Sequence, residues 1–219
     1  MKIYNKFIFS LFLGSLLPAQ VPDNNQINPH RFNDAERWEK IFEDTTRDEW
    51  QKPEQVISLM NIPENAVIAD IGSATGYFPV RFAQAAHKGK IFGIDIEPEM
   101  VDYLNQRARK EGFENLSSIL GKPDNPLIPE KVDLVFICNT YHHINERPKY
   151  FSQLKRDFRP GGQLVIVDFR KGDLPVGPPD EHKLAFSQVI EELTLAGYDL
   201  IQHYQELPYQ YMLTFKIKK

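Results

Sequence analysis

The most constraining stretch of the chain is an apolar segment that ends in a turn of small residues. Residues 66–71 are apolar apart from Asp70, and Gly72, Ala74 and Gly76 follow at alternate positions. This order predicts a short buried strand that runs into a helix. Where a parallel strand meets a helix, small residues let the backbone approach a ligand, and free N–H groups at the helix start face it. The stretch therefore predicts an α/β fold with a nucleotide-like ligand at this turn.

Glycine spacing separates two classes of nucleotide site. The dinucleotide pattern G-x-G-x-x-G is not met, because Tyr77 stands where its third glycine belongs. The pattern acid-x-Gly-x-Gly-x-Gly is met by Asp70, Gly72 and Gly76, with Ala74 at the middle glycine position. This arrangement resembles the first motif of the class I S-adenosylmethionine (SAM) methyltransferases. The resemblance implies that these residues and Tyr77 bind SAM, whose methionine half carries an ammonium group that suits Asp70 and that NAD lacks.

A second acid stands at the distance expected for a ribose contact. Residues 91–95 read as the second strand and end in Asp95, about twenty residues beyond the glycine turn. Both the SAM pattern and the dinucleotide pattern include a carboxylate at this position, where it reaches a pair of ribose hydroxyls. Asp95 and the adjoining Ile96 therefore predict a nucleoside site without choosing between the two cofactors.

The resemblance also implies roles for residues that follow the third and fourth strands. In class I methyltransferases an acid shortly after the third strand accepts a hydrogen bond from the adenine amino group, and Asp124 follows the predicted strand 116–120. The alternative is an ordinary turn, since Asp124 precedes an Asn-Pro pair. The fourth strand, 132–139, has its carboxyl end at the methyl group in that fold, so Asn139 and the segment after it line the space between cofactor and acceptor.

Segment 140–144 is the most chemically suggestive run, with Tyr141, His142 and His143 in succession. A histidine here suits the removal of a proton from an acceptor near neutral pH, and Tyr141 places a ring or hydroxyl near the sulfonium. On an extended segment neighbouring side chains point opposite ways, so at most one of the two histidines enters the cleft. The alternative is that one histidine caps the next helix and the other only supports the site.

Strand and helix patterns alternate from residue 66 to 196, which predicts a doubly wound α/β sheet covered on both faces. Seven strands are expected, at 66–71, 91–95, 116–120, 132–139, 163–169, 198–204 and 209–217. The last two form an antiparallel hairpin, so the sheet is mostly parallel with an antiparallel last strand. Before strand 163–169 we expect a helix over 147–158 and a turn at 159–162. After it we expect a long, stiff loop, 172–182, that acts as a rim or a lid over the substrate.

The domain organisation has four parts. Residues 65–219 correspond to the methyltransferase-like domain. A helix pattern begins before it with Asn33 as N-cap, and the resemblance implies that residues 33–64 form a helical cap over the cofactor cleft. In the cap, Trp50 and Gln51 either line the cleft or pack between helices. Residues 1–19 have the order of a secretory signal, with lysines before an apolar run at 7–17, and residues 20–32 read as a linker.

The apolar run at 7–17 is too short for a transmembrane helix, which needs about 20 apolar residues. We therefore expect export through a signal peptide, with an uncleaved membrane tether or a cytoplasmic protein as alternatives. An exported protein would be separated from the cytosol, where SAM is made. Export therefore conflicts with the use of SAM unless SAM is also supplied outside the cytosol.

Composition limits the partners. The formal net charge is −4 with no basic run, which argues against nucleic acid and favours a small-molecule acceptor. Cys138 is the single cysteine, and no histidine spacing suits a metal, so neither an internal disulfide nor a metal site is expected.

We predict methyl transfer from SAM to a small molecule. Within class I, the resemblance is to the small-molecule group related to quinone-biosynthesis and arsenite methyltransferases, although the arsenite enzymes rely on several cysteines that this chain lacks. The alternatives are an NAD-linked oxidoreductase and a SAM-binding module that has lost catalysis.

Overall fold

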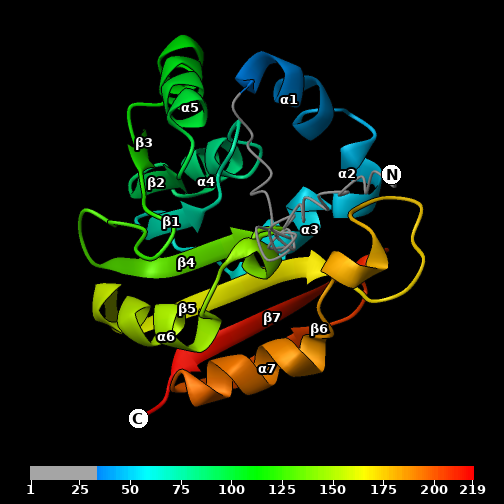
Figure 1. The fold of residues 1–219 in the computed structure, drawn as a ribbon. Coiled ribbons are helices and arrows are strands. Elements are labelled where there is room, and N and C mark those ends of the chain that lie inside the picture. Colours follow the sequence, from blue (N-terminus) through cyan, green and yellow to red (C-terminus); the bar gives the residue numbers. More distant parts are fainter. Residues whose placement is uncertain (1–33) are drawn as a thin grey trace, which may run out of the picture. The chain divides into compact units, whose positions relative to one another are not determined.

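A computed structural model describes residues 34–219, so the predicted signal peptide (1–19) and linker (20–32) lie outside the described residues. One seven-stranded sheet runs through the domain in the order β3-β2-β1-β4-β5-β7-β6 (Figure 1). The strands are β1 Val67–Ile71, β2 Lys90–Asp95, β3 Leu116–Leu120, β4 Val132–Cys138, β5 Phe158–Phe169, β6 Tyr198–Tyr204 and β7 Gln210–Ile217. Strand β7 is antiparallel to both neighbours and all other pairs are parallel. The predicted doubly wound, mostly parallel sheet is confirmed.

Helices cover both faces of the sheet. They are α1 Ala35–Phe42, α2 Arg47–Gln51, α3 Pro53–Met60, α4 Pro79–Ala85, α5 Pro98–Glu111, α6 Arg147–Leu154 and α7 Phe186–Leu195. The alternating side chains of β4 enter two separate cores: Phe136 packs with residues of α3, α4 and α5, while Val135 packs with residues of α6 and α7. Burying each such side chain stabilises the fold by about 1.5–3 kcal/mol. Successive strands are added to one side of β1 as far as β3 and to its other side from β4 onward, so the strand order reverses between β1 and β4, where ligands bind in folds of this type.

Three local predictions are wrong in detail. The N-cap of α1 is Asp34, whose carboxylate accepts the Arg37 N–H at 3.1 Å, and not Asn33. Helix α6 ends at Leu154, and Lys155–Asp157 form a 3₁₀ turn. The segment expected as a turn at 159–162 belongs to β5, because a bulge opposite β4 absorbs it where the register shifts between Val132 and Leu134.

Across residues 34–219, no helix combines the length and apolar character needed to span a bilayer.

Candidate functional site

The glycine turn forms as predicted between β1 and α4. The N–H groups of Gly72 and Ser73 both donate to the Ile94 carbonyl, at 2.8 and 3.1 Å, which fastens the turn to the end of β2. Gly72 and Gly76 have φ values of 80° and 98°, and a Cβ at Gly72 would collide with the Thr140 side chain. These two positions therefore require glycine. Ala74 adopts a left-handed φ of 44°, so the departure from the family motif is accommodated at a conformational cost.

Asp95 ends β2 directly beside this turn. Its carboxylate accepts the N–H of Ala74 at 2.9 Å and the N–H of Glu97 at 3.0 Å. Burial is the largest influence on this group and raises its pKa, against the lowering effect of these backbone bonds. A carboxylate has about four acceptor sites, so acceptor capacity remains for the hydroxyls of a ribose.

Two exposed apolar side chains flank Asp95. Ile96 is 50% exposed and Leu120 is 48% exposed, and Leu120 is the partner of Asp95 in the register of β2 and β3. They give the carboxyl ends of these strands an apolar surface of the kind on which a purine base packs.

Asp70 is a buried acid on β1. It is only 3% exposed, and burial, followed by the negative charge of Asp95, raises its pKa to about 8, while the positive charge of Arg47 acts in the opposite direction. No residue within 34–219 donates a hydrogen bond to its carboxyl group. A ligand with an ammonium group would supply that missing donor and favour the ionised form.

The N-terminal helices dock on the glycine turn. Glu43, the C-cap residue of α1, accepts the Thr75 hydroxyl at 2.8 Å and forms an ion pair with Arg107 of α5 at 2.8 Å. In α2, Asp48 accepts a hydrogen bond from the Tyr77 hydroxyl. The cap is therefore joined to residues of the turn itself.

Three hydrogen-bonded side-chain amides, those of Gln51, Gln210 and Asn139, join the cap to the ends of β4 and β7. Gln51 is fully buried and donates to Gln210 at 2.5 Å, and Gln210 donates to Asn139 at 2.6 Å. Beside them, the Trp50 ring lies 5.5 Å from the ring of Phe169. Gln51 and Trp50 therefore bridge α2 to the ends of β4, β5 and β7, and whether they also touch a cofactor stays a prediction.

His142 and Asp168 form a buried pair at the ends of β4 and β5. His142 Nδ1 lies 3.0 Å and 3.1 Å from the two carboxylate oxygens of Asp168, and the two side chains are 5% and 1% exposed. Asp168 also accepts the Phe169 N–H at 2.8 Å. An Nδ1–H held by a carboxylate leaves Nε2 as the ring nitrogen that can take up a proton.

The expectation that the two neighbouring histidines point opposite ways is wrong. Tyr141–His143 form a 3₁₀ turn instead of an extended segment, and the rings of His142 and His143 lie 4.1 Å apart. His143 is exposed, whereas His142 is held by Asp168.

Tyr141 does not face the site. Its ring is fully buried and stacks on Phe151 at 5.1 Å, and its hydroxyl donates to Glu192 at 2.8 Å. Burial, together with the Glu192 carboxylate, raises its pKa. Since Arg147 pairs with the same carboxylate at 2.6 Å, Tyr141 holds α6 against α7, and its predicted place beside the acceptor is corrected.

Asp124 is exposed in a tight turn closed by the backbone pair Lys122–Asn125. Asp124 is thus a turn residue, which is one of the two interpretations of the sequence. Its contact with adenine stays a prediction.

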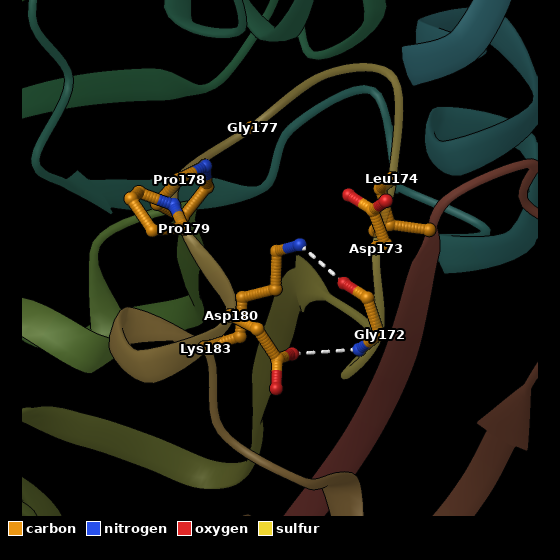
Figure 2. A pocket seen from close by; sticks show the side chains of 8 residues that line it. All are labelled: Gly172, Asp173, Leu174, Gly177, Pro178, Pro179, Asp180 and Lys183. Atoms are coloured by element: carbon orange, nitrogen blue, oxygen red, sulfur yellow. Dashed lines mark hydrogen bonds between the residues drawn. The ribbon is translucent and has the colours of Figure 1, made fainter.

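The loop that follows β5 lines a partly open pocket of about 490 Å³ (Figure 2). Lys183 is buried and donates from Nζ to the Gly172 carbonyl at 2.7 Å, while Asp180 accepts the Gly172 N–H at 2.6 Å. Gly177 lies against the Phe169 ring, where an added Cβ would be 2.7 Å from the nearest ring atom. The loop is thus closed by its own hydrogen bonds and packed on the residue next to Asp168.

Within the described part of the chain, no cluster of three or more His, Cys, Asp or Glu side chains has an arrangement that could hold a metal ion. The Cys138 thiol is buried, which raises its pKa and makes it a poor nucleophile.

The strand order, the reversed β7, and the acid-flanked glycine turn at the switch point define a class I, Rossmann-like SAM methyltransferase domain. Residues 62–214 match the family model described as a methyltransferase domain, and the chain belongs to this family.

Solved and curated relatives agree with this assignment. A SAM-dependent methyltransferase from Aquifex aeolicus is 27% identical with a TM-score of 0.78, over 84% of this chain and 98% of that one. A methyltransferase-like protein of Schizosaccharomyces pombe is 32% identical over 48% of this chain and 39% of its own length. A ubiquinone/menaquinone biosynthesis C-methyltransferase of Hydrogenovibrio crunogenus is 27% identical over 58% of this chain and 50% of its own length. The chain thus spans at most about half of these two curated relatives.

Two residues near the carboxyl ends of the central strands, Arg47 and Gln210, were not predicted as site residues. Arg47 opens α2, and its guanidinium lies 3.7 Å from the centroid of the Tyr77 ring. Gln210 begins an otherwise apolar strand and is fully buried. A polar residue at the start of an apolar strand was the available signal for Gln210, whereas nothing in the sequence distinguishes Arg47 from a surface cation.

Proposed function

We propose that the protein transfers a methyl group from SAM to a small-molecule acceptor. The observation that carries the proposal is the pairing of the Gly72–Gly76 turn with Asp95, whose carboxylate is fixed at the turn by two backbone N–H groups. Bound SAM supplies a methyl group that its positive sulfur has already activated. The protein therefore has to align the reactants and exclude water, and it needs no nucleophilic side chain.

Each residue has one task in this proposal. Asp95 accepts the ribose hydroxyls, Ile96 packs on adenine, and Asp70 receives the ammonium group. The fit rests on this structure, since Asp70 is a buried acid without a donor among the described residues and Asp95 keeps free acceptor sites.

His142 is the proposed general base. Its Nδ1 is held by Asp168, which fixes the ring and stabilises the imidazolium that forms when Nε2 takes the acceptor proton. This role requires an acceptor that loses a proton as it is methylated, such as a phenol, thiol or quinol.

The test is a titration with SAM followed by an acceptor panel of thiols, phenols, quinols and amines, with S-adenosylhomocysteine as the measured product. We expect micromolar SAM binding and product with at least one acceptor. Micromolar binding without product from any acceptor would favour the inactive SAM-binding module, and no binding would contradict the proposal.

We also propose that residues 1–19 direct export of the protein. The support is the order of charged, apolar and small residues in the sequence. Mass spectrometry of the native N-terminus combined with cell fractionation tests this, and an intact Met1 on a cytoplasmic protein would contradict it.

A further inference from the structure

Arg47 is held rigidly over the glycine turn. Its guanidinium carbon lies 3.7 Å from the centroid of the Tyr77 ring, and its two terminal nitrogens donate to the Phe42 carbonyl at 2.8 Å and to Gln51 at 3.3 Å. Stacking on an aromatic ring fixes the plane of the guanidinium, and the two hydrogen bonds fix its direction. The third nitrogen, Nε, therefore points in one defined direction.

That third nitrogen is buried and makes no hydrogen bond. Buried donors without a partner are rare in native proteins and costly when they belong to a charged group. Arg81, Arg107 and Arg147 each form an ion pair with a carboxylate, whereas no carboxylate within residues 34–219 pairs with Arg47. The site therefore holds a guanidinium that lacks an anion.

The position of Arg47 indicates which anion is missing. Arg47 donates to Gln51, whose side-chain oxygen also contacts the Cys138 thiol at 3.7 Å, so Arg47 lies near the end of β4, and its positive charge acts to lower the pKa of Asp70 on β1, which burial raises. Arg47 acts to lower the pKa of Asp70 without forming an ion pair with it, which leaves a basic and an acidic group in the same part of the site. An α-amino acid carries its ammonium and carboxylate on one carbon, so the groups that receive them must be neighbours.

We propose that Arg47 binds the α-carboxylate of the methionine half of SAM, next to Asp70, which receives the ammonium group. This inference rests on the proposed function and adds a residue outside the family match, which begins at residue 62. The N-terminal cap is then part of the cofactor site and not only its cover.

Decarboxylated SAM is the probe, because it keeps the ammonium, sulfonium and adenosine groups and lacks only the carboxylate. Calorimetric titrations compare SAM and decarboxylated SAM on the wild type, Arg47→Gln, Arg47→Lys and Asp70→Asn. Arg37→Gln is the matched control, since Arg37 is an exposed arginine of α1.

We expect Arg47→Gln to weaken SAM binding about 10- to 100-fold and to change binding of decarboxylated SAM by less than about threefold. Arg47→Lys keeps the charge without the fork of N–H groups, so its loss should be smaller. Asp70→Asn should weaken both ligands, and Arg37→Gln neither.

Two results would overturn this inference while leaving the proposed function intact. The first is that Arg47→Gln binds SAM as tightly as the wild type does. The second is that Arg47→Gln loses affinity for both ligands equally, which would indicate that Arg47 only docks the cap on the domain. Wild-type protein that binds neither ligand would overturn the proposed function and this inference together. If Arg47→Gln does not fold, as judged by circular dichroism, Arg47→Lys gives the same comparison.

Discussion

The proposed cofactor-binding and acceptor-binding parts of the site, which both lie at the carboxyl ends of the parallel strands, are built differently. At the proposed cofactor end, Asp70 lies on β1, Gly72 begins the turn between β1 and α4, and Asp95 ends β2, where main-chain bonds fix its carboxylate. At the proposed acceptor end, His142 lies in the 3₁₀ turn after β4 and Asp168 lies near the end of β5, and the hydrogen bond between their side chains joins them across two paired strands. The cofactor end is thus a local feature of the chain and the acceptor end is a product of the tertiary fold.

The largest effect is expected at the acceptor end. His142→Gln should lower the rate of S-adenosylhomocysteine formation about 10²- to 10⁴-fold, because it removes the general base, while SAM affinity stays within about threefold. His87→Gln is the control, since His87 is exposed and faces Glu64 at 3.7 Å. A variant His143→Gln that loses the activity while His142→Gln keeps it would assign the base to the other histidine.

At the cofactor end, Asp95→Ala should weaken SAM binding about 100-fold in calorimetry. The change removes two charge-assisted hydrogen bonds to the ribose and releases the Ala74 N–H from its acceptor. Asp102→Ala is the matched control, because Asp102 is an exposed acid on α5. Unchanged affinity in Asp95→Ala would show that the ribose assignment is wrong.

Asp70 makes the cofactor end sensitive to pH. Its pKa of about 8 in the free protein means that the ionised form, which the ammonium group prefers, becomes populated only as pH rises toward 8. SAM affinity should therefore increase about tenfold per pH unit between pH 6 and 7 and level off above 8. Asp70→Asn should remove this slope, and a flat profile in the wild type would contradict the assignment.

The same raised pKa makes a prediction about stability. The native state binds the Asp70 proton more tightly than the unfolded chain, so the free energy of unfolding contributed by this group falls as pH rises from about 4 to about 8. Asp70→Asn should raise the Tm of the ligand-free protein at pH 8 by several degrees, as measured by calorimetry. A lower Tm would indicate that the carboxylate stabilises the fold instead.

The smallest effect concerns the joint between cap and turn. Glu43→Gln removes the charge that pairs with Arg107 but keeps an acceptor for Thr75, so the Tm should fall by about 2–4 °C. Hydrogen exchange of residues 35–51 should rise at the same time. Unchanged exchange there would mean that other contacts, such as that of Asp48 with Tyr77, hold the cap.

The comparison also explains what the sequence could predict. The positions of the strands along the chain and the turn at Gly72 followed from local patterns, because apolar runs, small residues and acid spacing are all short-range signals. Tyr141 was misplaced because its hydroxyl partner, Glu192, lies on α7, far along the chain. The link between His142 and Asp168 depends on a strand pairing and on a 3₁₀ turn that no local pattern indicated.

The cofactor site is tested most directly by titrating the wild-type protein with SAM and, separately, with NADH. We expect a single SAM site of micromolar affinity and no binding of NADH. NADH binding in the absence of SAM binding would contradict it.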